Sequence, residues 1–131
     1  MSEEYPIRMF RNNEGNKRNW LKVMPIGIAL NTQAVGAMVK VIAGGKTMVR
    51  PIMAGQGYET SYCGPVHFGL GGSEKVDRVE VVFQDGTSVT VNEVASRQLL
   101  TIYQDGKATG VAFGAIGAST ALQTQISKLE K

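Results

Sequence analysis

The sequence predicts an all-β domain of about seven short antiparallel strands in a sandwich or barrel, with a short C-terminal helix or apolar tail. Three observations support this fold class. Apolar and polar residues alternate with a period of two along much of the middle of the chain. Pairs of these segments are separated by Asp-Gly or Gly-Gly. The 131 residues also include 16 glycines, which fits many tight turns.

The first predicted hairpin has the clearest pattern. Valine and phenylalanine alternate with polar residues from 76 to 84, and valine alternates with serine and threonine from 87 to 91, followed by Asn92. Asp85-Gly86 separates the two runs. Asp-Gly between alternating segments is a strong hairpin signal, because a tight two-residue turn needs positive φ at both positions.

A second hairpin is predicted for residues 37–43 and 46–53, joined through Gly44-Gly45, which meets the same requirement for positive φ. Pro51 lacks a backbone N–H, so it indicates an edge strand or a bulge. Pro25 is for the same reason poorly suited to a central strand. The remaining strands are expected at 20–26, 66–70 and 98–103.

The two ends of the chain differ from this middle. Residues 1–18 are expected to form an arm or linker, residues 19–106 the β-domain, and residues 107–131 an apolar and partly helical tail. In the tail, leucine and isoleucine recur at helical spacing, which predicts a helix of about three turns that needs a surface to pack on. Candidate self-assembly residues in the tail are Val111, Phe113, Ile116, Leu122, Ile126 and Leu129.

Composition and charge narrow the function classes. The net charge of +3 is mild and the basic residues are spread along the chain, so a nucleic-acid partner is not expected. Cys63 is the single cysteine, which excludes an intramolecular disulfide. No apolar run approaches the ~20 residues of a membrane span, and the acidic, polar start does not resemble a signal peptide.

No motif predicts an enzyme, a metal site or a cofactor. Gly45-Lys46-Thr47 resembles the end of a phosphate-binding loop, but that loop needs a glycine where this chain has Lys40. The single histidine excludes a histidine-rich zinc site. Cys63 and His67 are a possible nucleophile and base, although four extended residues separate them by about 13 Å. The alternative is a small buried thiol and a histidine on a strand face.

The candidate binding residues are found in and after the glycine-flanked loop at residues 55–62. Tyr58, Glu59 and Tyr62, with His67 on the following strand, offer aromatic and polar groups for a sugar or a partner surface. The alternative is a corner tyrosine that packs over the edge of the core. Both interpretations stay open at this point.

An ordered set of short segments resembles the ASPIC and UnbV domain family over approximately residues 19–104. The segments that carry this resemblance are Asn19-Trp20-Leu21-Lys22-Val23, Val35-Gly36-Ala37, Ala43-Gly44-Gly45, Gly55-Gln56-Gly57-Tyr58, His67-Phe68-Gly69-Leu70-Gly71, Val76-Asp77-Arg78-Val79-Glu80-Val81 and Gln98-Leu99-Leu100-Thr101-Ile102.

The resemblance implies a domain that closes a longer exported chain, after a propeller of FG-GAP-type repeats, and that works outside the cell or at its surface. It therefore favours a non-enzymatic module for interaction with a protein or glycan. One alternative is a structural subunit that assembles with copies of itself into an extracellular assembly or filament. The other is an accessory protein of small-molecule biosynthesis.

The chain departs from the family pattern at two places. The family often has an acidic residue in the stretch that corresponds to residues 31–34, which is neutral here, and a Ser-Asp pair before the segment at His67. These departures put a ligand role of those acids in doubt.

Overall fold

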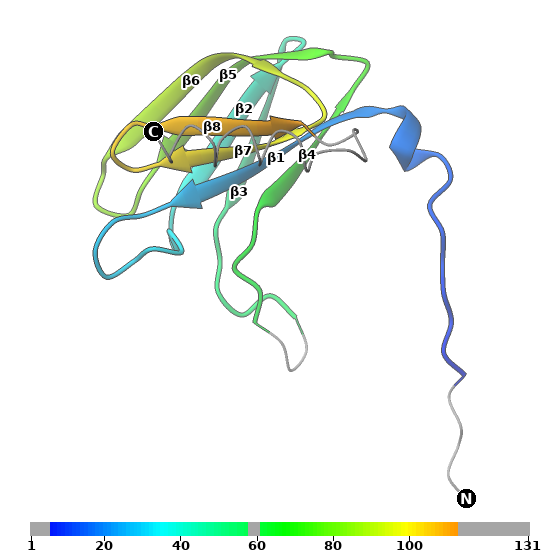
Figure 1. Ribbon diagram of the computed structural model, residues 1–131, viewed down its shortest axis with the longest axis horizontal. Helices are drawn as coiled ribbons and strands as arrows, with labels where there is room; N and C mark the ends of the chain where they lie inside the picture. Colours follow the sequence, from blue (N-terminus) through cyan, green and yellow to red (C-terminus); the bar gives the residue numbers. More distant parts are fainter. Residues whose placement is uncertain (1–5, 58–60, 113–131) are drawn as a thin grey trace, which may run out of the picture.

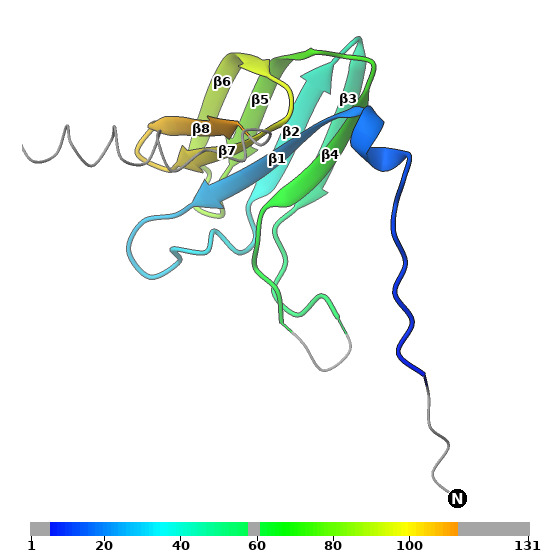
Figure 2. The ribbon, with the colours of Figure 1, turned by 45° about the vertical axis from the view of Figure 1, so that its right-hand side comes forward.

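Two four-stranded sheets form the body of the computed structural model, which describes residues 6–57 and 61–112 (Figure 1). Figure 2 shows the same arrangement from the side, with the N-terminal arm hanging away from the strands. The elements in chain order are η1 (Gly15–Lys17), β1 (Asn19–Ile26), β2 (Met38–Ala43), β3 (Lys46–Pro51), β4 (Val66–Gly71), β5 (Lys75–Val82), β6 (Ser88–Ala95), β7 (Gln98–Tyr103) and β8 (Ala108–Ala112).

The first sheet has the strand order β4-β1-β7-β8 and the second sheet has the order β3-β2-β5-β6. The predicted all-β sandwich is therefore confirmed, with one more strand than the seven expected. The additional strand, β8, pairs antiparallel with β7, from Ala112 opposite Gln98 to Ala108 opposite Ile102. A second difference is that β1 and β7 are parallel, whereas the other pairs are antiparallel.

The core lies between the two sheets and follows the period-two pattern. Leu21 and Val23 of β1 are fully buried, as are Val39 and Val41 of β2 in the opposite sheet. Among the described residues no polar or charged side chain is buried. Each buried valine or leucine stabilises the fold by roughly 1.5–3 kcal/mol relative to an exposed side chain.

Both predicted hairpins are present. Gly44 and Gly45 have φ of 54° and 74°, as the tight turn between β2 and β3 requires. Between β5 and β6 only Gly86 has a positive φ, so the expectation of two positive φ values is wrong for Asp85. The Gly86 N–H donates to the Phe83 carbonyl at 2.9 Å. This hydrogen bond closes a β-turn over residues 83–86. Gly86, in the left-handed backbone conformation, then directs the chain into β6.

The β7–β8 hairpin repeats this geometry. Gly106 has a φ of 96°, and its N–H donates to the Tyr103 carbonyl at 3.0 Å. We call residues 83–87 and 103–107 the twin turns. A hydrogen bond of 2.7 Å from Gln104 Nε2 to Asp85 Oδ2 joins them, although they close hairpins of different sheets.

In each of the twin turns an aspartate accepts a hydrogen bond from the backbone two residues later. Thr87 N–H donates to Asp85 at 2.9 Å, and Lys107 N–H donates to Asp105 at 3.1 Å. These hydrogen bonds lower the pKa of both carboxyl groups below the ordinary value, because they stabilise the charged form.

The two prolines within strands, Pro25 and Pro51, lie where their missing N–H costs little. Pro51 ends β3, the outermost strand of the second sheet, as predicted. Pro25 lies in β1, between two neighbours, but beyond the last pair of β1 with β4, Val23 opposite Val66. On that side β1 has no partner strand at Pro25, so no ladder hydrogen bond is lost.

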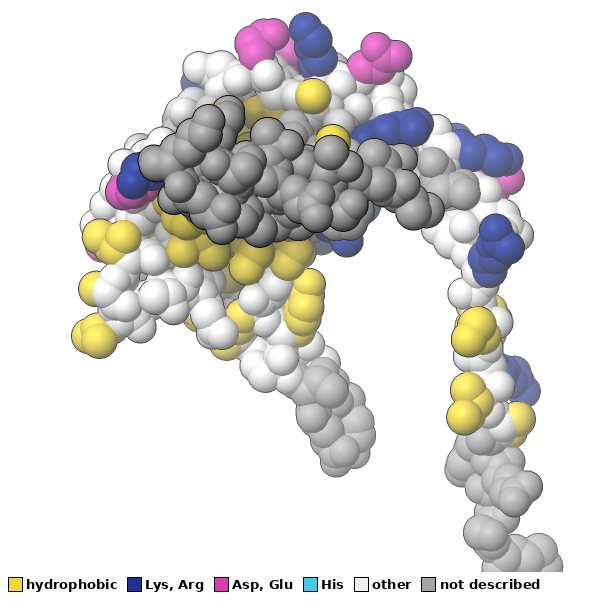
Figure 3. All heavy atoms as spheres, viewed as in Figure 1, with side chains coloured by type: hydrophobic (Ala, Val, Ile, Leu, Met, Phe, Trp, Pro, Cys, Tyr) yellow, Lys and Arg dark blue, Asp and Glu magenta, His cyan; other side chains and the backbone are white. Residues whose placement is uncertain are grey.

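The N-terminal arm before η1 exposes apolar side chains. Ile7, Met9 and Phe10 are 88–100% exposed, and Figure 3 shows hydrophobic side chains along this arm, away from the body. Arg97 ties the end of the arm to the sandwich through hydrogen bonds to the Lys17 carbonyl and to Asn19 Oδ1. None of the described helices is long and apolar enough to cross a membrane.

Candidate functional site

The candidate site lies where the outermost strands of the two sheets, β3 and β4, border the same open side of the sandwich. We call the surface formed by Arg18, residues 43–53, Gln56 and residues 62–73 the seam. It contains two hollows, one at each end of β3.

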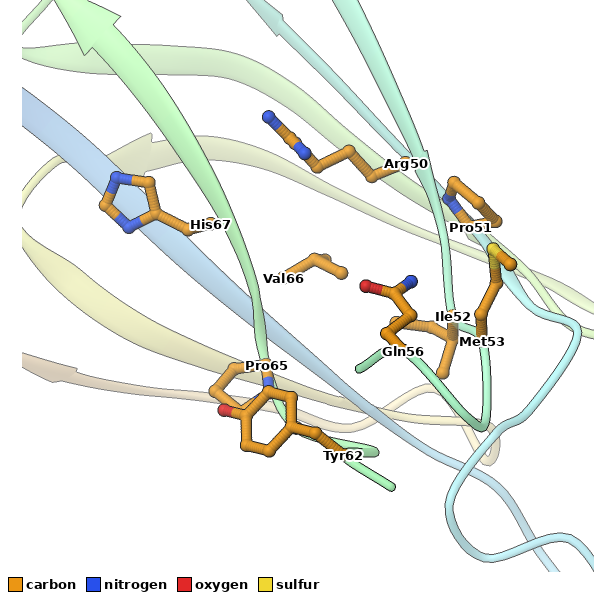
Figure 4. A pocket seen from close by; sticks show the side chains of 10 residues that line it. Arg50, Pro51, Ile52, Met53, Gln56, Tyr62, Pro65, Val66 and His67 are labelled. Carbon is orange, nitrogen blue, oxygen red and sulfur yellow. The ribbon is translucent and has the colours of Figure 1, made fainter. Parts of the chain in front are cut away.

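The first hollow, the Arg50 pocket, has a volume of about 240 Å³. Four polar side chains line it from different segments: Arg50 from β3, Gln56 and Tyr62 from the loop that follows, and His67 from β4 (Figure 4). Its remaining lining is mostly apolar and consists of Pro51, Ile52, Met53, Gly64, Pro65 and Val66. Apolar walls with a few convergent polar groups are typical of ligand pockets.

Local structure fixes the positions of these side chains. Arg50 lies opposite Val39, a buried residue of β2, so it is on the inner face of its strand. Its guanidinium carbon lies 5.9 Å from the centre of the Phe68 ring, within range of a cation–π contact. Gly64 leaves room for the Tyr62 ring, because a Cβ at this position would overlap it.

His67 lies on the outer face of β4. Its ring stacks on Trp20 of β1 at 6.0 Å between centroids, and Lys22 Nζ lies 6.0 Å from the centre of the Trp20 ring. Partial burial lowers the pKa of His67 below 6.5, and the charges of Lys22 and Arg50 lower it further. At neutral pH the imidazole is therefore mainly uncharged, and Arg50 supplies the charge of the pocket.

The second hollow, the Lys46 pocket, lies at the other end of the seam and has a volume of about 580 Å³. Its charged side chains are Arg18, at the end of the N-terminal arm, and Lys46, the first residue of β3. Glycines of β4 and the following turn leave it open. The described lining residues of the two pockets include three permanent cations and no aspartate or glutamate.

The structure brings together two of the predicted binding residues, Tyr62 and His67, in the Arg50 pocket. Tyr62 is 61% exposed. Tyr58 and Glu59 lie outside the described residues. Of the predicted assembly residues, Val111 lies on the edge strand β8 and is 50% exposed. The others, Phe113, Ile116, Leu122, Ile126 and Leu129, lie outside the described residues.

Sequence reasoning missed Arg18, Lys46, Arg50 and Gln56 as site residues. Arg50 offered one signal, because alternation places it on the same face as Met48, which packs against the core. A charged residue on the core-facing side of an edge strand indicates that the sandwich is open at that edge. The other three come from separate segments, and only the fold places them together.

The possible pairing of Cys63 with His67 as nucleophile and base is not assembled in one pocket. Cys63 Sγ lies 4.0 Å from the Met53 carbonyl, and Cys63 lines a different hollow, with Thr32 and Gln33. His67 lines the Arg50 pocket. Within residues 6–57 and 61–112, no group of three or more histidine, cysteine or acidic side chains is placed to hold a metal ion.

The neutral stretch at residues 31–34 has a structural role. Asn31 donates from Nδ2 to the Val35 carbonyl at 2.8 Å and accepts from the Val35 N–H at 3.0 Å. Ala34 has a φ of 51° and is buried. The loop between β1 and β2 is thus held by its own hydrogen bonds, and it exposes Ile28 and Leu30.

Comparison with known proteins identifies the family. Residues 27–109 match the family model described as ASPIC and UnbV. This chain belongs to the ASPIC and UnbV family. The match begins after β1 and ends within β8, so it includes most of the seam but not Arg18.

The family relationship extends to two curated proteins. The chain is 32% identical over 109 residues to cartilage acidic protein 1 of Homo sapiens, and 31% identical over 109 residues to cartilage acidic protein 1 of Mus musculus. Each match covers 76% of this chain but 15% of the relative. The ASPIC and UnbV domain described here therefore corresponds to a small part of those proteins.

A solved protein structure from Eubacterium rectale, determined by NMR, is also similar, with a TM-score of 0.47 and 13% sequence identity. The similarity covers 81% of this chain and 99% of that chain.

Proposed function

We propose that this domain is a non-enzymatic binding module that works outside the cell or at its surface, and that a protein or glycan partner binds in the Arg50 pocket. The observation that carries the proposal is that Arg50, Gln56, Tyr62 and His67, from different segments, line the same hollow. Such a set offers a charge, an amide, a phenol and an imidazole, which suits recognition of a polar partner.

Two further points support this proposal over a catalytic role. Cys63 and His67 line different, neighbouring hollows, so no single pocket brings them together as a nucleophile and base. The extracellular setting is supported by relatives that are named for cartilage.

The test is a binding screen of the chain against arrays of glycans and extracellular proteins, followed by Tyr62→Ala. Tyr62 is 61% exposed, so its truncation should weaken binding by about tenfold with little loss of stability. Tyr103→Ala is the matched control, because Tyr103 is also exposed but lies on β7, outside the seam. A screen without any partner, or equal binding by Tyr62→Ala and the wild type, would contradict the proposal.

Self-assembly is a second candidate, and β8 favours it. This strand is the outermost strand of the first sheet, all five of its residues are exposed, and none is charged. An uncharged edge strand can pair with the edge of another copy. Deletion of residues 108–131 should then lower the mass measured in solution by light scattering, and an unchanged oligomeric state would contradict this role.

A further inference from the structure

We propose that the seam binds a linear acidic polysaccharide, with carboxylate or sulfate groups, that contacts the Arg50 pocket and the Lys46 pocket at the same time. This inference rests on the proposed function, because it names the class of ligand for the same site. It extends that site from one pocket to the full length of β3.

The first argument is charge. Several basic residues elsewhere have acidic partners: Lys40 lies 3.7 Å from Glu80, Lys75 lies 3.9 Å from Glu93, and Lys107 lies 3.1 Å from Asp105.

The seam cations differ from these. Across the described part of the chain, no carboxylate lies within ion-pair distance of Arg18, Lys46 or Arg50. Their positive potential is therefore not cancelled locally, and it attracts an anionic ligand.

The second argument is spacing. Lys46 and Arg50 lie four residues apart on one strand, which corresponds to about 13 Å, and the whole strand spans about 20 Å. A small anion can reach the cations of one pocket only. A polymer that carries a charge on each repeat can reach both pockets, so it gains the attraction of both ends.

The third argument separates a polysaccharide from an acidic peptide. Peptides commonly bind an open sheet edge as an additional strand, with backbone hydrogen bonds along it. Pro51 at the end of β3 and Pro65 before β4 have no N–H to donate, so such a ladder cannot continue past either strand into the Arg50 pocket. The Tyr62 ring and the Gln56 amide instead suit the apolar faces and hydroxyl groups of sugars.

Arg50 also has a purely structural interpretation that the test must separate. An inward-pointing charge on an edge strand blocks unwanted pairing with other chains. Arg50→Glu keeps a charge on the inner face of β3 but reverses its sign. A loss of binding in this variant is therefore due to the sign of the charge and not to the loss of an inward charge. Arg50→Lys keeps the sign and gives the conservative comparison.

The experiment uses the full chain and measures binding of dextran sulfate and hyaluronan by calorimetry at about 50 mM and about 200 mM salt. Uncharged dextran, poly-glutamate and a single-stranded oligothymidylate are the comparison probes. The variants are Arg50→Glu, Arg50→Lys and Lys46→Glu. Arg78→Glu is the matched control, because Arg78 is exposed on β5 and pairs with Ile42 and Asn92, away from the seam.

The wild type is expected to bind at least one of the two acidic polysaccharides and not dextran. Arg50→Glu and Lys46→Glu should each weaken binding by about tenfold or more and reduce the salt slope by about one, because each removes a contact that releases counterions. Arg50→Lys should stay within about threefold of the wild type, as should Arg78→Glu, which tests non-specific attraction. Circular dichroism of each variant checks that it is folded, and Lys46 is exposed at the start of β3, so its variant does not disturb the core.

Three results would overturn the inference. One is an equal loss of binding in Arg78→Glu and Arg50→Glu, and another is tighter binding of poly-glutamate or the oligothymidylate than of either polysaccharide. The third is the absence of binding to both acidic polysaccharides. In each case the proposed function still stands if the wider screen finds a partner whose binding is weakened by Tyr62→Ala. The proposed function fails as well only if that screen also finds no such partner.

Discussion

The two open sides of the sandwich have different surfaces although both end in edge strands. The seam, between β3 and β4, carries Lys46, Arg50 and His67 and contains two pockets. On the opposite side, β6 and β8 contain no lysine, arginine or histidine, and their single charged residue is Glu93. The cations of the seam are therefore not a general property of the edges of this fold.

Both sides nevertheless limit edge-to-edge pairing. The seam has an inward charge at Arg50 and a proline at position 51. On the opposite side, Glu93 has a φ of 55° and no register partner in β5, so β6 is irregular there, and β8 is only five residues long. Inward charges, prolines, irregular strands and short strands are alternative devices for the same purpose. The comparison shows that edge protection does not require a cationic surface, and the proposed acidic ligand gives the charge of the seam a second role.

The largest difference between the two sides is expected in stability. Phe68→Ala removes a fully buried ring from β4 and should lower the free energy of unfolding by about 3–5 kcal/mol. Val111→Ala, on the exposed strand β8, should lower it by less than about 0.5 kcal/mol. Urea unfolding followed by circular dichroism measures both values. Similar losses in the two variants would show that β8 is as much a part of the core as β4.

The next effect concerns the turns that hold the strands of the opposite side. Gly86 and Gly106 have φ of 87° and 96°, and a Cβ at either position would meet open space. An alanine at either position therefore clashes with no neighbour but is strained by the positive φ. Each substitution should lower the free energy of unfolding by about 1–2 kcal/mol. Gly69→Ala on β4 is the control, because its Cβ also meets open space and its φ is not positive. If Gly69→Ala costs as much as Gly86→Ala, backbone conformation is not the cause.

The smallest expected effect is the pH response of the seam. The pKa of His67 is lowered in the folded state, so the unfolded chain binds the proton more tightly. The folded state therefore loses stability relative to the unfolded state as the pH falls below the pKa of His67 in the unfolded chain, about 6.5. From about pH 7 to about pH 5, the Tm of the wild type should fall slightly more than the Tm of His67→Gln.

Binding should respond in the opposite direction. Protonated His67 adds a positive charge to the Arg50 pocket, so an acidic ligand should bind more tightly at about pH 5 than at about pH 7. His67→Gln should reduce this gain. Equal pH dependence of Tm and of binding in the wild type and His67→Gln would show that His67 does not titrate in this range.

Local turn chemistry explains why much of the fold was predictable. Gly44-Gly45 and Asp85-Gly86 identify their hairpins within a few residues, and the strands beside them alternate regularly. The parallel pair of β1 and β7 has no such signal, because its residues are far apart in the chain and nothing local specifies the partner. β8 has the sequence Ala-Thr-Gly-Val-Ala, which lacks an alternating pattern, and it is a strand through its pairing with β7.

The candidate site was predictable in part for the same reason. Tyr62 and His67 are aromatic or titratable residues near one another in sequence, so they could be selected as binding residues from the sequence. Arg50 was not selected, because a charged residue in an alternating segment is normally assigned to the solvent face, and its alternation with Met48 is a weak signal by itself. Its pairing with Val39 in the β2–β3 hairpin shows which face it shares, and only the packing of the other sheet shows that this is the inner face.

The parallel pairing of β1 with β7 has a consequence for the timing of synthesis. The second sheet draws on residues 38–95, whereas β1 of the first sheet must wait for β7, since Leu21 pairs with Gln98. At typical elongation rates this delay is about 4–15 s, far longer than a hairpin takes to form. During that interval β1, with Leu21 and Val23, lacks its neighbour β7, so the first strand of this domain to be synthesised is among the last to complete its pairing.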